Sequence, residues 1–305
     1  MSVLVVGSLN VDLISKCETA PKAGETIHGD SFTTSLGGKG ANQAFACKRM
    51  GSETFFAGAL GNDNYKDLFL DNLKKENISI EYIKFKNTNT GVASILVEAN
   101  GQNRICLCAG ANLAYSQDDL NEIDQLMENV NIVVTQCEMQ KTIVEELALK
   151  CQKANKPLIL NPAPATKLND YVYQDLYCIT PNETELATLI NKDLNTLDDY
   201  ILGAKELLAK GVQNVIVTLG EKGSLLVNQK NEILIPARKV NVVDTIGAGD
   251  SFTGAIAAML DQGHDLLESM KIATYVASLA IQKEGGIPSM PYKDEVLKEM
   301  AKDKM

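Results

Sequence analysis

The sequence predicts an α/β fold in which a mainly parallel sheet lies between two layers of helices. Short apolar runs, typical of buried parallel strands, alternate with amphipathic helical patterns, and such alternation is typical of βα units. The runs are Val3–Val6, Ile132–Thr135, Leu158–Leu160 and Val215–Leu219, and the clearest helical segments are Lys141–Ala154 and Leu197–Lys210. Gly211 follows the second of these segments, and glycine is a favoured helix stop.

Two strand-rich stretches interrupt this alternation. Leu13–Leu36 contains no good helix, and Ile78–Ala109 contains an Asn100-Gly101 pair, which favours a hairpin turn. The strands expected in the second stretch are Ile78–Phe85, Val92–Glu98 and Arg104–Cys108. We therefore expect a single domain over residues 1–305, with a small β-sheet lid inserted at about 13–36 and 78–109. An ordinary edge hairpin is the alternative.

Composition excludes several classes of protein. The chain has 305 residues, 45% of them hydrophobic, which suits one large globular domain. A formal net charge of −10 argues against a nucleic-acid partner. No run of 18 apolar residues predicts a membrane span, and no basic and apolar leader precedes Val3, so we expect a cytoplasmic protein.

The cysteines do not predict a metal site. There are seven cysteines without a CxxC pair, and only two histidines, so a structural zinc site is not expected. We expect reduced, mostly buried thiols. Cys106 and Cys108 lie two residues apart and are expected to pack on one face of a strand.

A glycine-rich bend at Asp244–Phe252 precedes a helical pattern of small and apolar residues. Backbone N–H groups at such a helix start, here Gly247, Ala248 and Gly249, can bind an anion. The carboxylate of Asp250 lies in the same turn and could take a proton while the amides stabilise negative charge. This pairing points to phosphoryl transfer to a hydroxyl. A helix capped by an aspartate is the alternative.

Two further motifs carry polar side chains, and the first of them suits a sugar. Asn10 and Asp12 follow the first strand and point the same way in an extended chain, so together they could bind vicinal hydroxyls. An Asx turn is the alternative. Gly37–Ala44 is a glycine-rich turn that opens a helix, with Lys39 and Asn42 on one face. It matches neither a Walker A loop nor a dinucleotide fingerprint, and packing glycines at a capped helix are its alternative.

Two motifs suit a metal ion and a phosphate. Asn182 and Glu185 share one face of a helix start after the strand Tyr177–Ile179 and could hold hydrated Mg²⁺. A helix start with a glutamate in its first turn, which is very common, is the alternative. Thr218 could donate to a phosphate, with Gly220 and Gly223 allowing close backbone approach. A plain hairpin turn into Ser224–Val227 is the alternative.

Together these motifs resemble the ribokinase-like (PfkB) family of sugar kinases along the whole chain and in the family's order. The strongest are GGKGANQA at Gly37–Ala44 and DTIGAGDSF at Asp244–Phe252. The other matching segments are Gly7–Asp12, Gly24–Gly29, Gly110–Asn112, Asn161–Ala165 and Pro181–Glu185. The resemblance implies ATP-dependent phosphorylation of D-ribose at the 5-hydroxyl, giving ribose 5-phosphate and ADP.

The resemblance also implies a role for each matching residue. Asp250 would be the base, and the amides of Gly247, Ala248 and Gly249 would form the anion hole for the γ-phosphoryl group. The sugar ligands would be Asn10, Asp12, Gly38, Lys39, Asn42, Glu138 and Asp250. Thr218, Gly220, Gly223, Gly249 and Asn182 would bind the nucleotide, while Asn182 and Glu185 would hold Mg²⁺ through water.

A monovalent cation, usually K⁺, is a further implication. The matching positions, most of which would ligate through backbone oxygens, are Asp244, Ile246, Ala280, Lys283, Gly285 and Ser289. Ile246 replaces the threonine that the family usually has, which removes a hydroxyl but leaves the carbonyl. The resemblance further implies a homodimer formed through the lid.

Three alternatives remain open from the sequence. A kinase of the same fold could act on another sugar, such as deoxyribose, or on a nucleoside. A non-catalytic sugar- or nucleotide-binding protein is a different class, which the intact Asp250 and its glycines argue against. A nicotinamide dehydrogenase fits less well, because the dinucleotide fingerprint is missing.

Overall fold

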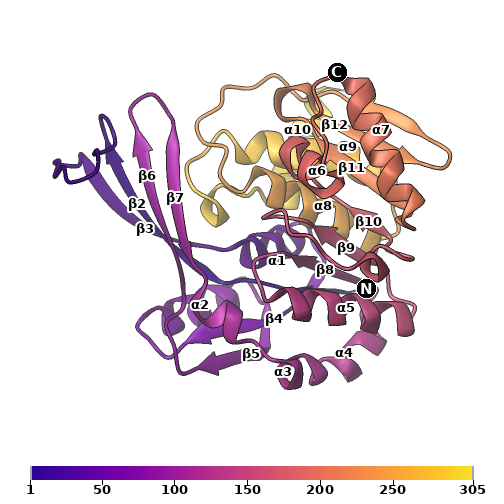
Figure 1. The fold of residues 1–305 in the computed structure, drawn as a ribbon, viewed down its shortest axis with the longest axis horizontal. Coiled ribbons are helices and arrows are strands. Elements are labelled where there is room, and N and C mark those ends of the chain that lie inside the picture. The colour runs from indigo at the N-terminus through magenta and orange to yellow at the C-terminus, as the bar shows by residue number, and fades with distance from the viewer. Residues whose placement is uncertain (1, 304–305) are drawn as a thin grey trace.

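The computed structural model describes residues 2–303 and contains a nine-stranded sheet with helices on both faces, and a second sheet of four strands (Figure 1). The strands of the main sheet follow the order β13-β12-β11-β10-β9-β8-β1-β4-β5. Their bounds are β1 Ser2–Val6, β4 Glu53–Gly61, β5 Ser79–Lys86, β8 Ile132–Gln136, β9 Leu158–Asn161, β10 Cys178–Ile179, β11 Asn214–Thr218, β12 Ser224–Asn228 and β13 Glu232–Ile235. The predicted α/β class with a small second sheet is confirmed.

Parallel pairing brings the carboxyl ends of the central strands to one edge of the main sheet. β1 pairs in parallel with β4 and β8, for example Val3 with Thr54 and with Ile132. Parallel pairing continues through β9, β10 and β11, and only β12 and β13 run antiparallel. Segments that leave the parallel strands at this edge are therefore close in space, which is where open α/β sheets bind ligands.

The helices cover the two faces of the main sheet, each over its own apolar core (Figure 1). Val3 and Val5 of β1 belong to one core and Leu4 and Val6 to the other, as strand alternation requires. The helices over the first core are α1 Lys39–Arg49, α2 Tyr65–Lys75, α8 Ala248–Asp261, α9 Leu266–Ala280 and α10 Lys293–Lys302. Over the second core lie α3 Gln117–Asn121, α4 Asp124–Asn129, α5 Lys141–Lys153, α6 Glu183–Ile190 and α7 Leu197–Ala209.

Short 3₁₀ turns connect some of these elements. They are η1 Gly110–Ala114, η2 Asp170–Val172, η3 Gly220–Lys222 and η4 Ile287–Ser289. Among residues 2–303, no helix combines the length and the apolar character needed to cross a bilayer.

The second sheet, which we call the lid, projects from the main sheet on the left of Figure 1. Its strand order is β3-β2-β6-β7, with β2 parallel to β6 and the other pairs antiparallel. The bounds are β2 Asn10–Cys17, β3 Ser31–Gly37, β6 Gly91–Glu98 and β7 Asn103–Cys108. The expected hairpin lies between β6 and β7, where Gly101 has a φ of +83°.

The prediction that Ile78–Phe85 belongs to the lid is wrong. This segment forms β5, which pairs in parallel with β4 at the edge of the main sheet. Its alternation of apolar and polar residues suits any half-buried edge strand, so the pattern cannot tell which sheet the strand joins. The lid strands from this stretch are β6 and β7 alone.

The expectation for the cysteines is partly wrong. Five of the seven are buried, but Cys106 and Cys108 are exposed. Both lie in β7, the edge strand of the lid, where all six residues are exposed. They share one side of the strand as expected, but an edge strand that is open to solvent offers them no core.

Candidate active site

The candidate site is formed where the starts of α1 and α8 meet the carboxyl end of β1. Gly38 and Gly247 precede these helices with φ values of +91° and +74°, which favour glycine. A Cβ on Gly247 would lie 3.1 Å from the Cα of Gly286, so two loops also approach each other closely here. No side chain caps α8, and Asp250 lies within its first turn, so the capping interpretation of Asp250 is not supported.

The Asp250 carboxylate is buried and holds two amide hydrogen bonds. It is 6% exposed. Asn42 Nδ2 donates to Oδ2 at 2.8 Å, and Gln43 Nε2 donates to Oδ1 at 3.2 Å. Because these donors are neutral, they hold the carboxylate without neutralising its charge. The negative charge of Asp250 is the main cause that raises the pKa of the nearby Lys39 ammonium.

Glu138 organises a second group of polar atoms. Its Oε2 accepts hydrogen bonds from Ser8 Oγ, from Asn10 Nδ2 at 3.2 Å and from the backbone N–H of Lys39 at 3.1 Å. Burial raises the pKa of the Glu138 carboxyl, although Lys39 and the hydrogen bonds oppose this shift. The structure therefore brings together Asn10, Lys39 and Glu138, as the resemblance implies for sugar ligands.

Asp12 is a buried carboxylate without a hydrogen-bond partner among residues 2–303. It is 8% exposed. Burial, followed by the charges of Glu138 and Asp250, raises its pKa to about 7. A Cβ on Gly37 would lie 2.3 Å from Asp12 Oδ2, so a larger residue there would displace this carboxylate. Burying such a group is costly unless a ligand supplies its hydrogen bonds.

Sequence reasoning gave no role to Asn112, which fixes the start of the lid. Its Oδ1 accepts from Leu9 N at 2.9 Å, and its Nδ2 donates to Asn10 Oδ1 at 2.8 Å. A Cβ on Gly91 would lie 2.1 Å from the same Asn10 oxygen. In the sequence, Asn112 could have been found only through the segment Gly110–Asn112, which matches the family. The sequence motifs also gave no role to Gln43, although it lies inside the matching segment GGKGANQA.

Asn182 and Glu185 form the capping box of α6, as the alternative interpretation expected. Asn182 Oδ1 accepts from Glu185 N at 2.7 Å, and Glu185 Oε2 accepts from Asn182 N at 2.8 Å. An isolated parallel bridge places Asn182 beside Thr218. Burial raises the pKa of Glu185, and Asp250 raises it further, so this carboxyl lies near the same site.

The segment around Gly220 and Gly223 is a hairpin, as its alternative interpretation expected. β11 and β12 pair antiparallel, with Thr218 opposite Ser224. Gly223 has a φ of +105°, and a Cβ there would lie 2.0 Å from Ile235 O, so this glycine is required by the neighbouring β13. Gly220 faces open space, which leaves its backbone accessible to a ligand.

Asp244 joins the two loops that carry the candidate cation ligands. Its Oδ1 accepts from Ile246 N at 3.0 Å, and its Oδ2 accepts from Gly285 N at 2.9 Å. Ser289 Oγ donates to Gly286 O at 2.7 Å in the same loop. The Lys283 ammonium lies 3.3 Å from Glu295, so Lys283 could contribute only its backbone carbonyl. The Ala280 carbonyl accepts from Lys283 N at 3.1 Å.

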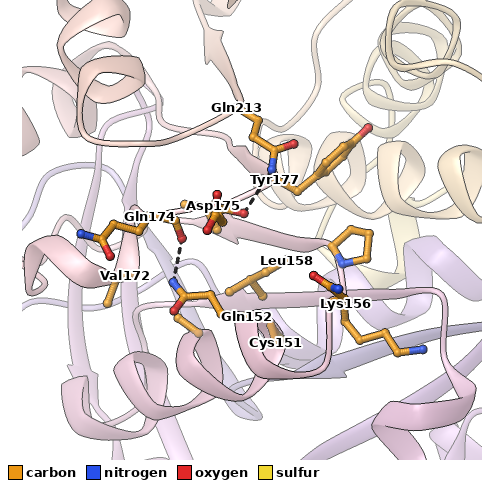
Figure 2. Close-up of a pocket in the computed structure, with 13 residues that line it drawn as sticks. Cys151, Gln152, Lys156, Leu158, Val172, Gln174, Asp175, Tyr177 and Gln213 are labelled. Atoms are coloured by element: carbon orange, nitrogen blue, oxygen red, sulfur yellow. Dashed lines mark hydrogen bonds between the residues drawn. The ribbon is translucent and has the colours of Figure 1, made fainter.

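A cavity of about 360 Å³ lies at the other end of the strands and is not this site (Figure 2). It lies beside Leu158 and Tyr177, where β9 and β10 begin, whereas the candidate site lies where β1 ends. Gln152, one of its polar side chains, donates to Tyr171 O and Gln174 O. Its amide therefore joins α5 to the backbone at Tyr171 and Gln174.

Comparison with known proteins agrees with this geometry. A model of the pfkB family of carbohydrate kinases matches residues 1–293. The chain is 37% identical over 295 residues to the deoxyribokinase of Salmonella typhi, covering 95% of this chain and 96% of the relative. It is 36% identical over 300 residues to the ribokinase of Bacillus subtilis, covering 97% and 98%.

Solved structures agree as well. The structure of Arabidopsis thaliana ribokinase complexed with ribose and ATP superimposes with a TM-score of 0.89 at 35% identity, covering 97% of each chain. The match spans the main sheet and the lid, so the resemblance inferred from the motifs is confirmed. The chain therefore belongs to the pfkB family of carbohydrate kinases and is a phosphotransferase with an alcohol group as acceptor.

Proposed function

We propose that this protein transfers the γ-phosphoryl group of ATP to the 5-hydroxyl of D-ribose, giving ribose 5-phosphate and ADP. The observation that carries the proposal is the partnerless, buried carboxylate of Asp12 beside the Glu138 group. A ligand with several hydroxyls would supply the missing hydrogen bonds. The ribokinase relatives and the Arabidopsis complex with ribose and ATP support this choice of substrate.

In the proposed reaction, the 5-hydroxyl oxygen attacks the γ-phosphorus while the bond to the bridging oxygen of ADP breaks. Asp250 accepts the hydroxyl proton, and ADP leaves with the bond's electron pair. Among residues 2–303 the backbone N–H groups of Gly247 and Gly249 have no acceptor, so both can bind the transferring group. Ala248 N already donates to Thr245 O at 3.2 Å and would contribute less.

We propose that Asn10, Asp12, Gly38, Lys39, Asn42 and Glu138 hold the sugar. The nucleotide would lie against Thr218, Gly220 and Gly223, with Asn182 and Gly249 at its phosphates. This arrangement is supported by the bridge that places Asn182 beside Thr218 and by the open space at Gly220. The lid would cover the sugar and exclude water, which prevents wasteful hydrolysis of ATP.

The residues present also suit the two proposed ions. Glu185 Oε1 accepts no hydrogen bond from residues 2–303, so it could bind the water shell of Mg²⁺ with Asn182. Mg²⁺ neutralises phosphate charge when bound. The carbonyl and hydroxyl oxygens of Ile246, Ala280, Lys283, Gly285 and Ser289 would supply the hard oxygen ligands that suit K⁺, which is supported by the bonds from Asp244 to Ile246 and Gly285.

Two finer features belong to the same proposal. We propose a homodimer formed through the lid, supported by exposed apolar side chains on its strands, including Phe32 at 63%, Ile105 at 57% and Leu107 at 39% exposure. We also propose a cytoplasmic location, where ATP is available. The second candidate substrate is 2-deoxy-D-ribose, which the similarity to a deoxyribokinase favours.

The direct test measures ADP formation from ATP and Mg²⁺ over a panel of sugars and nucleosides, with K⁺ or Na⁺ present. We expect the highest kcat/KM with D-ribose, and a higher rate with K⁺ than with Na⁺. Higher kcat/KM with 2-deoxy-D-ribose or a nucleoside would contradict the proposed substrate but keep the reaction. Absence of turnover with every acceptor would favour a non-catalytic binding protein.

A further inference from the structure

Three buried side-chain amides form a hydrogen-bonded row that ends on Asp250. They are Gln43 of α1, Gln136 of β8 and Asn161 of β9, with exposed fractions of 0%, 0% and 7%. Buried polar side chains are costly unless their hydrogen bonds are made, so such a row requires an explanation. The roles proposed above use none of these three residues.

The contacts run in one direction along the row. Gln136 Nε2 donates to Gln43 Oε1 at 2.7 Å. Gln43 Nε2 donates both to Asp250 Oδ1 and to Asn161 Oδ1, each at 3.2 Å. Asn161 Nδ2 in turn donates to Thr180 O at 3.0 Å, at the end of β10. The row thus connects Asp250 to three strands of the main sheet.

The chemistry of the neighbours fixes the orientation of the Gln43 amide. If the amide were reversed, its oxygen would face both the Asp250 carboxylate and the Asn161 oxygen, and its NH₂ group would face the NH₂ group of Gln136. The first two contacts would be repulsive, whereas Gln136, whose own Oε1 has no hydrogen-bond partner among residues 2–303, could reverse together with Gln43. Asn161 cannot relieve them, because its own NH₂ group is engaged with Thr180 O. Gln43 is therefore held as a donor to Asp250.

Gln43 also differs from the other donor to Asp250. Asn42 binds Oδ2 and is a proposed sugar ligand, whereas Gln43 binds Oδ1 from within the protein core. A carboxylate held at both oxygens cannot turn about its terminal torsion, which is otherwise soft. The hydrogen bond from Gln43 therefore keeps Oδ1 of Asp250 in place whether or not sugar is bound.

We propose that Gln43, oriented by Asn161, is a positioning residue that fixes the Asp250 carboxylate for proton transfer. The inference rests on the proposed role of Asp250 as the base. A misplaced catalytic group lowers the rate of the chemical step more than it weakens the binding of substrate. Loss of Gln43 should therefore lower kcat and leave the KM for the sugar nearly unchanged.

The first test is Gln43→Met, which keeps the length of the side chain and removes the donor. We expect kcat with D-ribose to fall about 100-fold, the typical effect of a slight misplacement, with KM close to wild type. Gln152→Met is the matched control, because this glutamine also donates two hydrogen bonds but lies in the distant cavity of Figure 2. Its kcat should match wild type. Equal kcat in Gln43→Met and wild type would overturn the inference.

The second test, Gln43→Glu, separates positioning from a structural role. The introduced carboxyl can donate to Asp250 only while it is protonated, so the ratio of variant to wild-type kcat should fall as pH rises between about 6 and 8. Using the ratio removes the contribution of the other charged groups near Asp250, namely Asp12 of β2, Lys39 of α1, Glu138 after β8 and Glu185 of α6. A ratio independent of pH would contradict the inference.

Asp250→Asn keeps this inference separate from the proposed function. If Asp250→Asn retains turnover, the proposed base is wrong, whatever the Gln43 variants show. If Asp250→Asn is inactive while Gln43→Met and Gln43→Glu behave as wild type, only the positioning role is wrong. Thermal unfolding of each variant shows whether it folds. If Gln43→Met does not fold, the pH dependence of kcat in Gln43→Glu decides whether Gln43 positions Asp250.

Discussion

At the scale of single residues, Asp12 shows how a proposed sugar ligand lowers the stability of the sugar-free protein. Burial, together with two neighbouring carboxylates, disfavours its charge and raises the pKa of its carboxyl from the ordinary 3.8 to about 7. Between these pH values the folded protein keeps a proton that the unfolded chain releases. The contribution of Asp12 to the free energy of unfolding of the sugar-free protein therefore falls as pH rises from about 4 to about 7.

Asp12→Asn tests this argument. We expect the variant to lose this contribution to the pH dependence, which is at most about 1.4 kcal/mol per pH unit for one proton. It should be more stable than wild type above pH 7, and its KM for D-ribose should rise, because the ligand loses a charged acceptor. The measurement is urea unfolding over this pH range, together with sugar kinetics.

Asp30→Asn is the control for this test, because Asp30 is an exposed aspartate at the start of the lid's β3 segment. It should follow the wild-type pH dependence. If Asp12→Asn showed the same slope as wild type, the carboxyl would not carry the shifted pKa, and the account of Asp12 would fail.

At the scale of elements, the junction between the main sheet and the lid depends on Thr90. Its Oγ1 donates to Asp63 Oδ1 at 2.9 Å and accepts from Gly61 N at 3.0 Å, while its backbone N–H donates to Asp63 Oδ2 at 2.6 Å. The next residue, Gly91, begins β6 and pairs with Asn10. The end of β4 is thus tied directly to the strand beside a proposed sugar ligand.

Thr90→Val keeps the shape of this side chain and removes its hydroxyl. The N–H of Gly61 is then buried without a partner, so we expect the free energy of unfolding to fall by about 1–3 kcal/mol. The KM for D-ribose should rise, because Asn10 is less firmly placed. Urea unfolding and steady-state kinetics check both effects, and Thr88→Val, at an exposed threonine of the same segment, is the control. Equal effects of the two substitutions would contradict the role given to Thr90.

The elements also show what could be predicted from the sequence. The buried strands and the two long helices were predicted to within a residue or two, because their apolar periodicity reflects burial that the main sheet imposes on each segment. β5 was assigned to the wrong sheet, because pairing partners are decided by contacts far apart in the chain. Lid strands of alternating character carry no information about which sheet they join.

For the site, motif reasoning found residues whose spacing reflects local structure, such as Lys39 and Asn42 on one helix face. It gave no role to Gln43, Gln136 or Asn161, because these come from three elements and meet only in the folded protein. The capping box at Asn182 and Glu185 shows the opposite case. There the local structural interpretation is confirmed, and the ligand role remains a proposal.

At the scale of the whole molecule, the lid leaves apolar side chains exposed at its edge, which the proposed dimer would cover. Ile105 and Leu107 lie on one side of β7, at 57% and 39% exposure. Exposed apolar edge strands invite association with another chain. Each lid would then be held in place by its partner as well as by its own junction.

Ile105→Glu tests the dimer. We expect sedimentation to show wild type at twice the mass of the chain and the variant as a monomer, because a charge on this strand is costly to bury. Leu202→Glu is the control, since Leu202 is exposed to 60% on α7, away from the lid. A monomeric wild type, or a dimeric Ile105→Glu, would contradict assembly through this strand.

The proposed reaction depends on the meeting of the main sheet, the lid and the start of α8 around one carboxylate. The measurement that tests it most directly compares ADP formation and D-ribose binding in wild type and Asp250→Asn. We expect turnover to fall by about 10²–10⁴-fold, as for loss of a general base, while the variant still binds ribose, because the ligands around Glu138 remain. Turnover of Asp250→Asn close to that of wild type would contradict the account.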